Sequence, residues 1–157
     1  MRDGLILGYG NPLCSDDGVG WRVVETLAHV LPQGWAAETV YQLTPEWAEP
    51  ISLAAVVIFV DAAVGDCPGE VRDFPLAPVA RRAGSHEATP EGLLAMAQDL
   101  FGRCPPAHMV TITGGSFAIA ETLTPAVEAA VPTAVERITS YLGVVEATWS
   151  PTFWRRR

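Results

Sequence analysis

The sequence predicts an α/β fold in which helices cover both faces of a mostly parallel sheet. Short apolar runs rich in β-branched residues alternate with segments of helical periodicity, an order typical of strand–helix units. The run Ala54–Val60 is apolar throughout, as expected of a central strand buried on both faces. Thr-Pro pairs at 44–45, 89–90 and 124–125 each precede a helix-compatible segment. Because a proline in the first helical turn loses no hydrogen bond, each pair predicts a helix start with the threonine as its cap.

The N-terminal segment predicts one strand followed by one helix. Leu5–Leu7 is a short apolar run that ends at Gly8. Apolar residues then recur at spacings of four, four and three, which predicts the buried face of a helix. These residues are Val19, Val23, Leu27 and Val30. A side-chain oxygen of Ser15 or Asp16 is expected to cap the free N–H groups of that helix.

The remaining elements follow in order. Strands are expected at Thr39–Leu43, at Val71–Phe74 (weak, suited to a sheet edge) and at His108–Thr113, and helices near 45–54, 90–101 and 125–142. Pro132 lies inside the last helix, where a kink or a break is expected. No internal repeat or linker divides the chain, so residues 1–157 are expected to form a single domain with a loosely attached tail from about residue 147.

Composition limits the function. The net charge of −8 gives the chain no electrostatic reason to bind nucleic acid. Three cysteines without a Cys-x-x-Cys pair argue against a disulfide scaffold or a structural zinc site. The longest apolar run, Leu53–Val60, is far below the ~20 residues of a membrane helix. The N-terminal apolar run is also too short for a signal peptide. A cytoplasmic location is therefore expected. A monomer is the simplest expectation, because no amphipathic stretch is left over once the sheet is covered.

Three polar segments are expected to meet at one edge of the sheet, because ligands of open α/β sheets bind at the carboxyl ends of the strands. The first is the turn 8–20 after the first strand, which contains Asp17. The second is Asp61, directly after the central apolar run, and the third is 84–87, which contains His86.

The turn 8–20 resembles a dinucleotide-binding turn only in part. Leu13 occupies the position where that motif requires a third glycine, and Asp16 and Asp17 would repel a phosphate. A carboxylate in a first helical turn is favoured in its ionised form, so Asp17 could instead be a metal ligand or a base. Asp16 fits better as a structural capping residue.

Asp61 admits two interpretations. A buried carboxylate needs a partner or a metal, but the same residue could simply accept backbone N–H bonds in the following turn. His86 could be an ordinary loop histidine. Two carboxylates and an imidazole together would suit a divalent transition metal such as nickel or zinc. Cys14 is more consistent with packing than with nucleophilic catalysis, and the serines lack the sequence context of a nucleophile elbow.

The residues Leu7-Gly8-Tyr9-Gly10-Asn11-Pro12-Leu13 and Ser15-Asp16-Asp17-Gly18-Val19-Gly20 resemble the N-terminal signature of the hydrogenase maturation proteases. The resemblance continues through 59–62, 85–86 and 123–128. Some family members have Glu at the position of Asp17, and some have a glycine-rich turn where this chain has Gln42-Leu43-Thr44-Pro45-Glu46. These departures leave the cognate hydrogenase open.

The resemblance implies a three-layer α/β/α sandwich on a twisted, mostly parallel sheet. It implies a metal-dependent, aspartyl-like endopeptidase that removes a C-terminal peptide from the large-subunit precursor of a nickel-iron hydrogenase. Asp17, Asp61 and His86 would be the catalytic and metal-contacting residues. The nickel would come with the precursor, and no organic cofactor is implied. The alternative is a nickel-dependent checkpoint or chaperone that binds the precursor without cutting it.

Overall fold

The computed structural model describes residues 2–80 and 87–148, with side chains up to residue 142. Its strands form one five-stranded sheet in the order β2-β1-β3-β5-β4. The strands are β1 (Gly4–Tyr9), β2 (Trp35–Val40), β3 (Val57–Ala63), β4 (Val71–Leu76) and β5 (Ala107–Thr113). β1, β2, β3 and β5 pair in parallel, and β4 is antiparallel at one edge. The predicted α/β class, the mostly parallel sheet and the edge position of β4 are confirmed.

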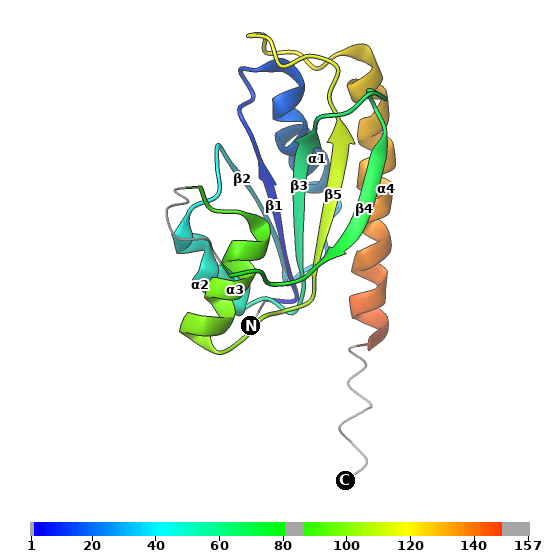
Figure 1. Cartoon of the computed structure of the whole chain (residues 1–157). Helices are drawn as coiled ribbons and strands as arrows, with labels where there is room; N and C mark the ends of the chain where they lie inside the picture. Colours follow the sequence, from blue (N-terminus) through cyan, green and yellow to red (C-terminus); the bar gives the residue numbers. More distant parts are fainter. Residues whose placement is uncertain (1, 81–86, 149–157) are drawn as a thin grey trace.

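Helices form a layer on each side of the sheet (Figure 1). The helices are α1 (Val19–Leu27), α2 (Ala48–Ser52), α3 (Pro90–Phe101) and α4 (Pro125–Thr148), with short 3₁₀ turns η1 (Ser15–Gly18) and η2 (Pro45–Trp47). One core cluster joins α1 and α4 to one face of the sheet. A second joins α2 and α3 to the other face. This is the three-layer sandwich that the family resemblance implied.

Successive strand residues face opposite layers, and this alternation decides where each polar side chain lies. Ile58 and Val60 of β3 belong to the α1–α4 cluster, whereas Val57 and Phe59 belong to the α2–α3 cluster. Asp61 continues the second series and therefore faces the side of α2 and α3. β3 extends two residues beyond Asp61, so this carboxylate lies within the strand and not directly after it, as was expected.

Several predicted boundaries in the first half are wrong. The central strand, predicted at Ala54–Val60, is Val57–Ala63. The second strand is Trp35–Val40, not Thr39–Leu43, because its parallel register with β1 runs from Gly4↔Trp35 to Tyr9↔Val40. Helix α1 ends at Leu27, and Val30 is 59% exposed instead of buried.

Helix starts are only partly as predicted. The Thr89 hydroxyl accepts a hydrogen bond from the Gly92 N–H at 3.0 Å and caps α3. Thr44 makes no such bond. Neither Ser15 nor Asp16 caps α1: both lie in η1, and the residue before α1 is Gly18.

The break expected at Pro132 does not occur, because α4 continues through it to Thr148. Pro132 is exposed, whereas the opposite side of the helix is buried in the α1–α4 cluster. The buried residues are Val127, Ala130, Val131, Ala134 and Ile138. Their burial, at about 1.5–3 kcal/mol for each large aliphatic side chain, offsets the roughly 3 kcal/mol that an internal proline costs. The tail predicted from about residue 147 lies mostly outside the described residues.

Candidate functional site

Glycines let the first helix pack directly against the sheet. A Cβ on Gly8 would lie 2.3 Å from the Gly20 carbonyl oxygen, and one on Gly20 would lie 2.6 Å from the Val60 carbonyl oxygen. No side chain fits at such distances. The start of α1 therefore contacts the main chain of β1 and β3, and this contact brings the preceding turn η1 to the carboxyl ends of both strands.

Gly10 closes the same turn. Its φ is 134°, a conformation that other residues rarely adopt, and an added Cβ would lie 2.1 Å from the Asp17 carbonyl oxygen. The main chain at Gly10 therefore packs directly against the main chain at Asp17, and only glycine fits at this position.

Asp17 is held at the rim by Asn11. The Asn11 N–H donates to Asp17 Oδ2 at 2.7 Å, and the Asn11 side-chain oxygen accepts the Leu13 N–H at 2.9 Å. The second bond makes an Asx turn, and backbone hydrogen bonds from Cys14 to Asn11 and from Ser15 to Ala120 also hold the loop. Asp17 remains partly exposed, so its carboxylate is available at the surface.

Asp61 has the most perturbed carboxyl group at this rim. Burial raises its pKa, and the nearby negative charge of Asp17 raises it further, to about 7. A hydrogen bond from the Ala62 N–H, at 2.8 Å to Oδ1, opposes this shift. A carboxylic acid with a pKa near 7 can both accept and donate a proton at neutral pH, which is the property that general acid–base catalysis requires. The alternative interpretation predicted the backbone N–H bond that Asp61 accepts from Ala62, and both interpretations remain open.

Tyr9 is a partner of Asp61 that the sequence analysis missed. Its hydroxyl hydrogen-bonds the Asp61 carboxylate and lowers the pKa of that group. Burial, followed by the charge of Asp61, raises the pKa of Tyr9, so the phenol stays protonated and acts as the donor. The alternation of side chains along the strands could have indicated this contact. Tyr9 follows Leu5 and Leu7 on one face of β1, as Asp61 follows Val57 and Phe59 on β3.

Asp16 is a structural residue, though not a helix cap. It is fully buried, and its carboxylate accepts four hydrogen bonds. Oδ2 accepts from the N–H groups of Gly115 and Ser116 and from the Thr124 hydroxyl, at 2.8, 3.0 and 2.7 Å, and Oδ1 accepts from the Thr124 N–H at 2.7 Å. Burial alone would raise the pKa of Asp16, but these hydrogen bonds lower it overall. The residue joins the loop 114–124 to the turn that carries Asp17.

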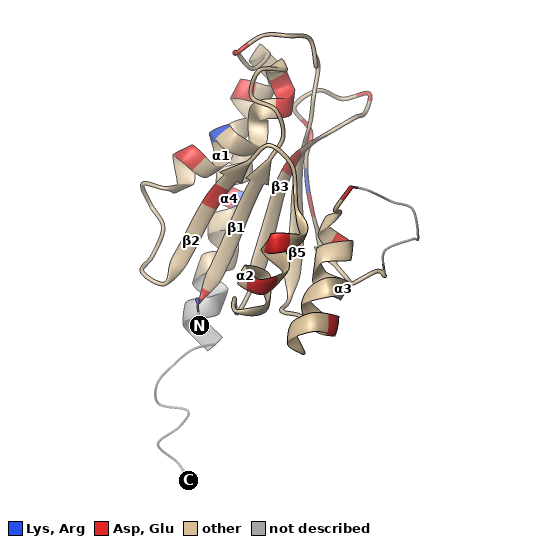
Figure 2. Ribbon diagram, turned by 90° about the vertical axis from the view of Figure 1, so that its left-hand side faces the viewer, with Lys and Arg blue, Asp and Glu red and all other residues tan. Residues whose placement is uncertain are grey.

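The predicted third site residue, His86, lies outside the described residues. Among those that are described, no group of three or more His, Cys, Asp and Glu side chains could hold a metal ion. The negative charge of Asp17 contributes to the raised pKa of Asp61, so the two carboxyl groups lie near each other. Acidic residues also occur on the loops beyond the strand ends (Figure 2).

Cys14, the weaker candidate nucleophile, is partly buried. Its backbone forms an isolated bridge with Ala120, and no ionisable partner of its thiol emerges in the described part of the chain.

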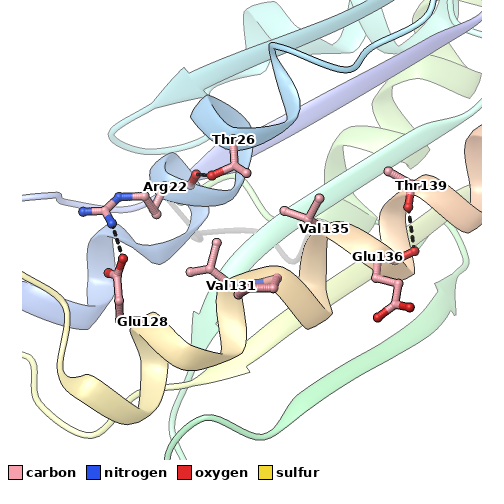
Figure 3. Close-up of a pocket in the computed structure, with 8 residues that line it drawn as sticks. Arg22, Thr26, Glu128, Val131, Val135, Glu136 and Thr139 are labelled. Atoms are coloured by element: carbon pink, nitrogen blue, oxygen red, sulfur yellow. Dashed lines mark hydrogen bonds and ion pairs between the residues drawn. The ribbon is translucent and has the colours of Figure 1, made fainter.

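A hollow of about 530 Å³ lies between α1 and α4 (Figure 3). The Arg22–Glu128 ion pair, at 2.6 Å, lies at one end of it, and Val131 and Val135 form part of its wall. Asp61 faces the opposite layer of the sandwich, so this hollow does not belong to the acidic rim.

No protein-family model matches the sequence, and no curated protein matches it. Several solved structures are similar to this chain. The hydrogenase maturating endopeptidase HybD from E. coli is 25% identical, with a TM-score of 0.74 over 90% of this chain and 92% of that one. The hydrogenase 2 maturation peptidase from a Thaumarchaeota archaeon is 27% identical, with a TM-score of 0.69 over 91% and 99%.

A third structure, the [NiFe] hydrogenase maturation protease HybD from Thermococcus kodakarensis, is 26% identical, with a TM-score of 0.70 over 90% of this chain and 99% of that one. The fold of this chain is that of the hydrogenase maturation proteases. This likeness supports the family that the N-terminal signature indicated. Within the described residues of the chain, no helix is both long enough and apolar enough to cross a membrane.

Proposed function

We propose that this chain is an endopeptidase that removes a C-terminal peptide from the nickel-loaded large-subunit precursor of a nickel-iron hydrogenase. The observation that carries the proposal is the pair of carboxylates at the strand ends, with Asp61 at a pKa of about 7 beside Asp17. The names of the similar structures support a protease of hydrogenase maturation. The acting form is expected to be a monomer.

In this proposal, nickel arrives as part of the substrate. Asp17 and Asp61 would contact it through carboxylate oxygens, and His86 is proposed as the third contact. A divalent cation beside Asp61 would favour its ionised form. The same contact would hold the scissile bond near the rim only when nickel is present, so the metal would act as a recognition element.

Asp61 is the proposed acid–base residue. As a carboxylate, it would accept a proton from the water that attacks the scissile carbonyl carbon. As the resulting acid, it would donate a proton to the amide nitrogen that leaves. Tyr9 and the Ala62 N–H each donate a hydrogen bond to Asp61, so the carboxylate would keep one orientation during both steps.

Intact mass spectrometry of a nickel-loaded large-subunit precursor, before and after incubation with this protein, tests the proposal. The expected result is a mass loss equal to a C-terminal peptide, absent with nickel-free precursor. An unchanged mass together with a stable complex would contradict cleavage and support the checkpoint alternative. An unchanged mass without a complex, across the available precursors, would contradict both.

A further inference from the structure

A second hollow, of about 480 Å³, lies at the carboxyl ends of β3 and β5 and is closed by the connection to β4. We call it the β3–β5 hollow. Its lining includes Val64, Asp66, Arg72, Phe74, Thr111 and Thr113. The 480 Å³ is within the range of binding pockets in proteins, roughly 300–1,000 Å³.

The floor of the β3–β5 hollow is continuous with the acidic site. In the parallel register of β3 and β5, Asp61 is the partner of Thr111 and Ala63 is the partner of Thr113. Side chains at paired positions face the same side of a sheet. Asp61 and the floor of the hollow therefore share one face, one strand spacing of about 4.8 Å apart.

The helical layer on this face does not reach the hollow. α2 and α3 pack on the amino-terminal parts of the strands, where Val57, Ala107 and Met109 are buried. On the same face, Thr113 is buried and Thr111 is only partly buried, whereas Phe74, which pairs with Met109 from the edge strand β4, is 43% exposed. β4 and the neighbouring part of β5 therefore expose a stretch of sheet near the proposed catalytic carboxylate.

The walls of the hollow combine apolar and acidic groups. Val64 is 91% exposed, so its side chain is open to contact with a ligand that enters the hollow. Glu70 forms an ion pair with Arg72, with N···O distances of 3.2 and 3.4 Å. Asp66 adds an exposed carboxylate in a chain whose net charge is −8.

We propose that the β3–β5 hollow binds an extended segment of the precursor adjacent to the scissile bond, carrying an apolar side chain against Val64 and Phe74 and a basic one near Asp66. This inference rests on the proposed function, because the precursor is its substrate. Because the floor of the hollow continues to Asp61, the bound segment would be the one beside the cleaved bond. Glu70 and Arg72 offset each other's charge, and the remaining carboxylate of Asp66 favours a basic neighbour.

Processing kinetics of Val64→Arg test the hollow. The substitution places bulk and positive charge where the segment would bind, and it removes almost no buried surface. We expect KM to rise by about tenfold or more while kcat stays within about twofold, the pattern of lost binding without lost chemistry. Leu100→Arg is the matched control, because Leu100 is 67% exposed near the end of α3. An unchanged KM in Val64→Arg would overturn the inference and leave the peptidase proposal intact.

Cys67 offers a second readout that needs no turnover. It is exposed and lines the hollow. Its alkylation rate is measured by peptide mass spectrometry in the Asp61→Asn protein, with and without nickel-loaded precursor. We expect at least about fivefold protection at Cys67 and none at a Leu100→Cys control site, because only a covered thiol is shielded from the reagent.

Equal alkylation of Cys67 with and without bound precursor would overturn the inference. This measurement also separates it from the proposed function. If the wild-type protein fails to cleave, the peptidase proposal fails, yet protection of Cys67 would still support the hollow as the site that binds the segment.

Discussion

Asp16 and Asp61 are both removed from water at the same rim, but their surroundings are opposite. Asp16 is fully buried and accepts four hydrogen bonds, which together lower its pKa. Asp61 is less buried, accepts bonds from Ala62 and Tyr9, and faces the charge of Asp17, so its pKa rises to about 7. Burial alone therefore does not distinguish a structural carboxylate from a reactive one.

The difference shows which group is free to change its charge. A carboxylate whose acceptors are all used is stabilised in one state and serves as a fixed anchor. A carboxylate with few donors and a like charge nearby has two protonation states of similar free energy at neutral pH. Two neighbouring signature residues, Asp16 and Asp17, thus contribute to different regions: one to the anchor and one to the reactive pair.

The largest effect is expected for Asp61→Asn on processing. Loss of the acid–base group should lower the rate of precursor cleavage by about a thousandfold, within the 10²–10⁴ range of such residues, while precursor binding remains. Mass spectrometry of the cleaved product measures the rate of cleavage. Asp99→Asn, an exposed site on α3, removes the same charge and should leave the rate unchanged. A normal rate in Asp61→Asn would exclude the proposed role.

Asp16→Ala should mainly affect stability. It removes the acceptor of the Gly115, Ser116 and Thr124 N–H groups. A hydrogen bond to a charged group contributes about 1.5–3 kcal/mol, and water can replace part of this at residues that are not fully buried. We expect the free energy of unfolding in urea to fall by about 3 kcal/mol. Asp17→Ala, which removes one such bond, from Asn11, should cost about 1 kcal/mol or less. Equal losses in the two variants would contradict the assignment of Asp16 as the anchor.

The raised pKa of Asp61 predicts how stability depends on pH. The folded protein holds this proton more tightly than the unfolded chain, so the resulting stability is complete below the unfolded pKa of about 4 and is lost as pH rises through about 7. The Asp61→Asn variant does not lose this stability as pH rises. Relative to the wild type, it should therefore gain about 2 kcal/mol between pH 5 and pH 8. Urea titrations at both values measure the gain, and a constant difference would contradict the raised pKa.

Tyr9→Phe should have the smallest effect. The variant keeps the ring in the α2–α3 cluster and removes only the hydroxyl that donates to Asp61. We expect the cleavage rate to fall by about three- to tenfold, consistent with one hydrogen bond of about 1 kcal/mol. Tyr41→Phe, at an exposed tyrosine, is the control. Identical rates in the two variants would show that Tyr9 does not orient Asp61.

The sequence predicted those features that depend on local patterns. The Ala54–Val60 run indicated the central strand, and Thr89 and Pro90 placed the start of α3 where the structure has it. Asp61 was found because it follows an apolar run. The second strand was shifted, since its position is set by pairing with β1 and its own residues, Ala36 and Ala37, carry little strand signal.

The role of Asp16 could not be predicted, because its partners are 99 to 108 positions further along the chain. The partnership of Tyr9 and Asp61 likewise depends on which strands are neighbours in the sheet. His86 lies outside the described residues, so its membership of the site stays a prediction.

The close contacts of Gly8 and Gly20 also affect how far the sequence can diverge without a change of structure. Main-chain atoms set how far α1 lies from β1 and β3, so exchanging core side chains elsewhere does not have to move the turn that carries Asp17. Most of the sequence can then diverge while this rim keeps its shape. The chain is only 25% identical to the E. coli endopeptidase, yet the two structures have a TM-score of 0.74.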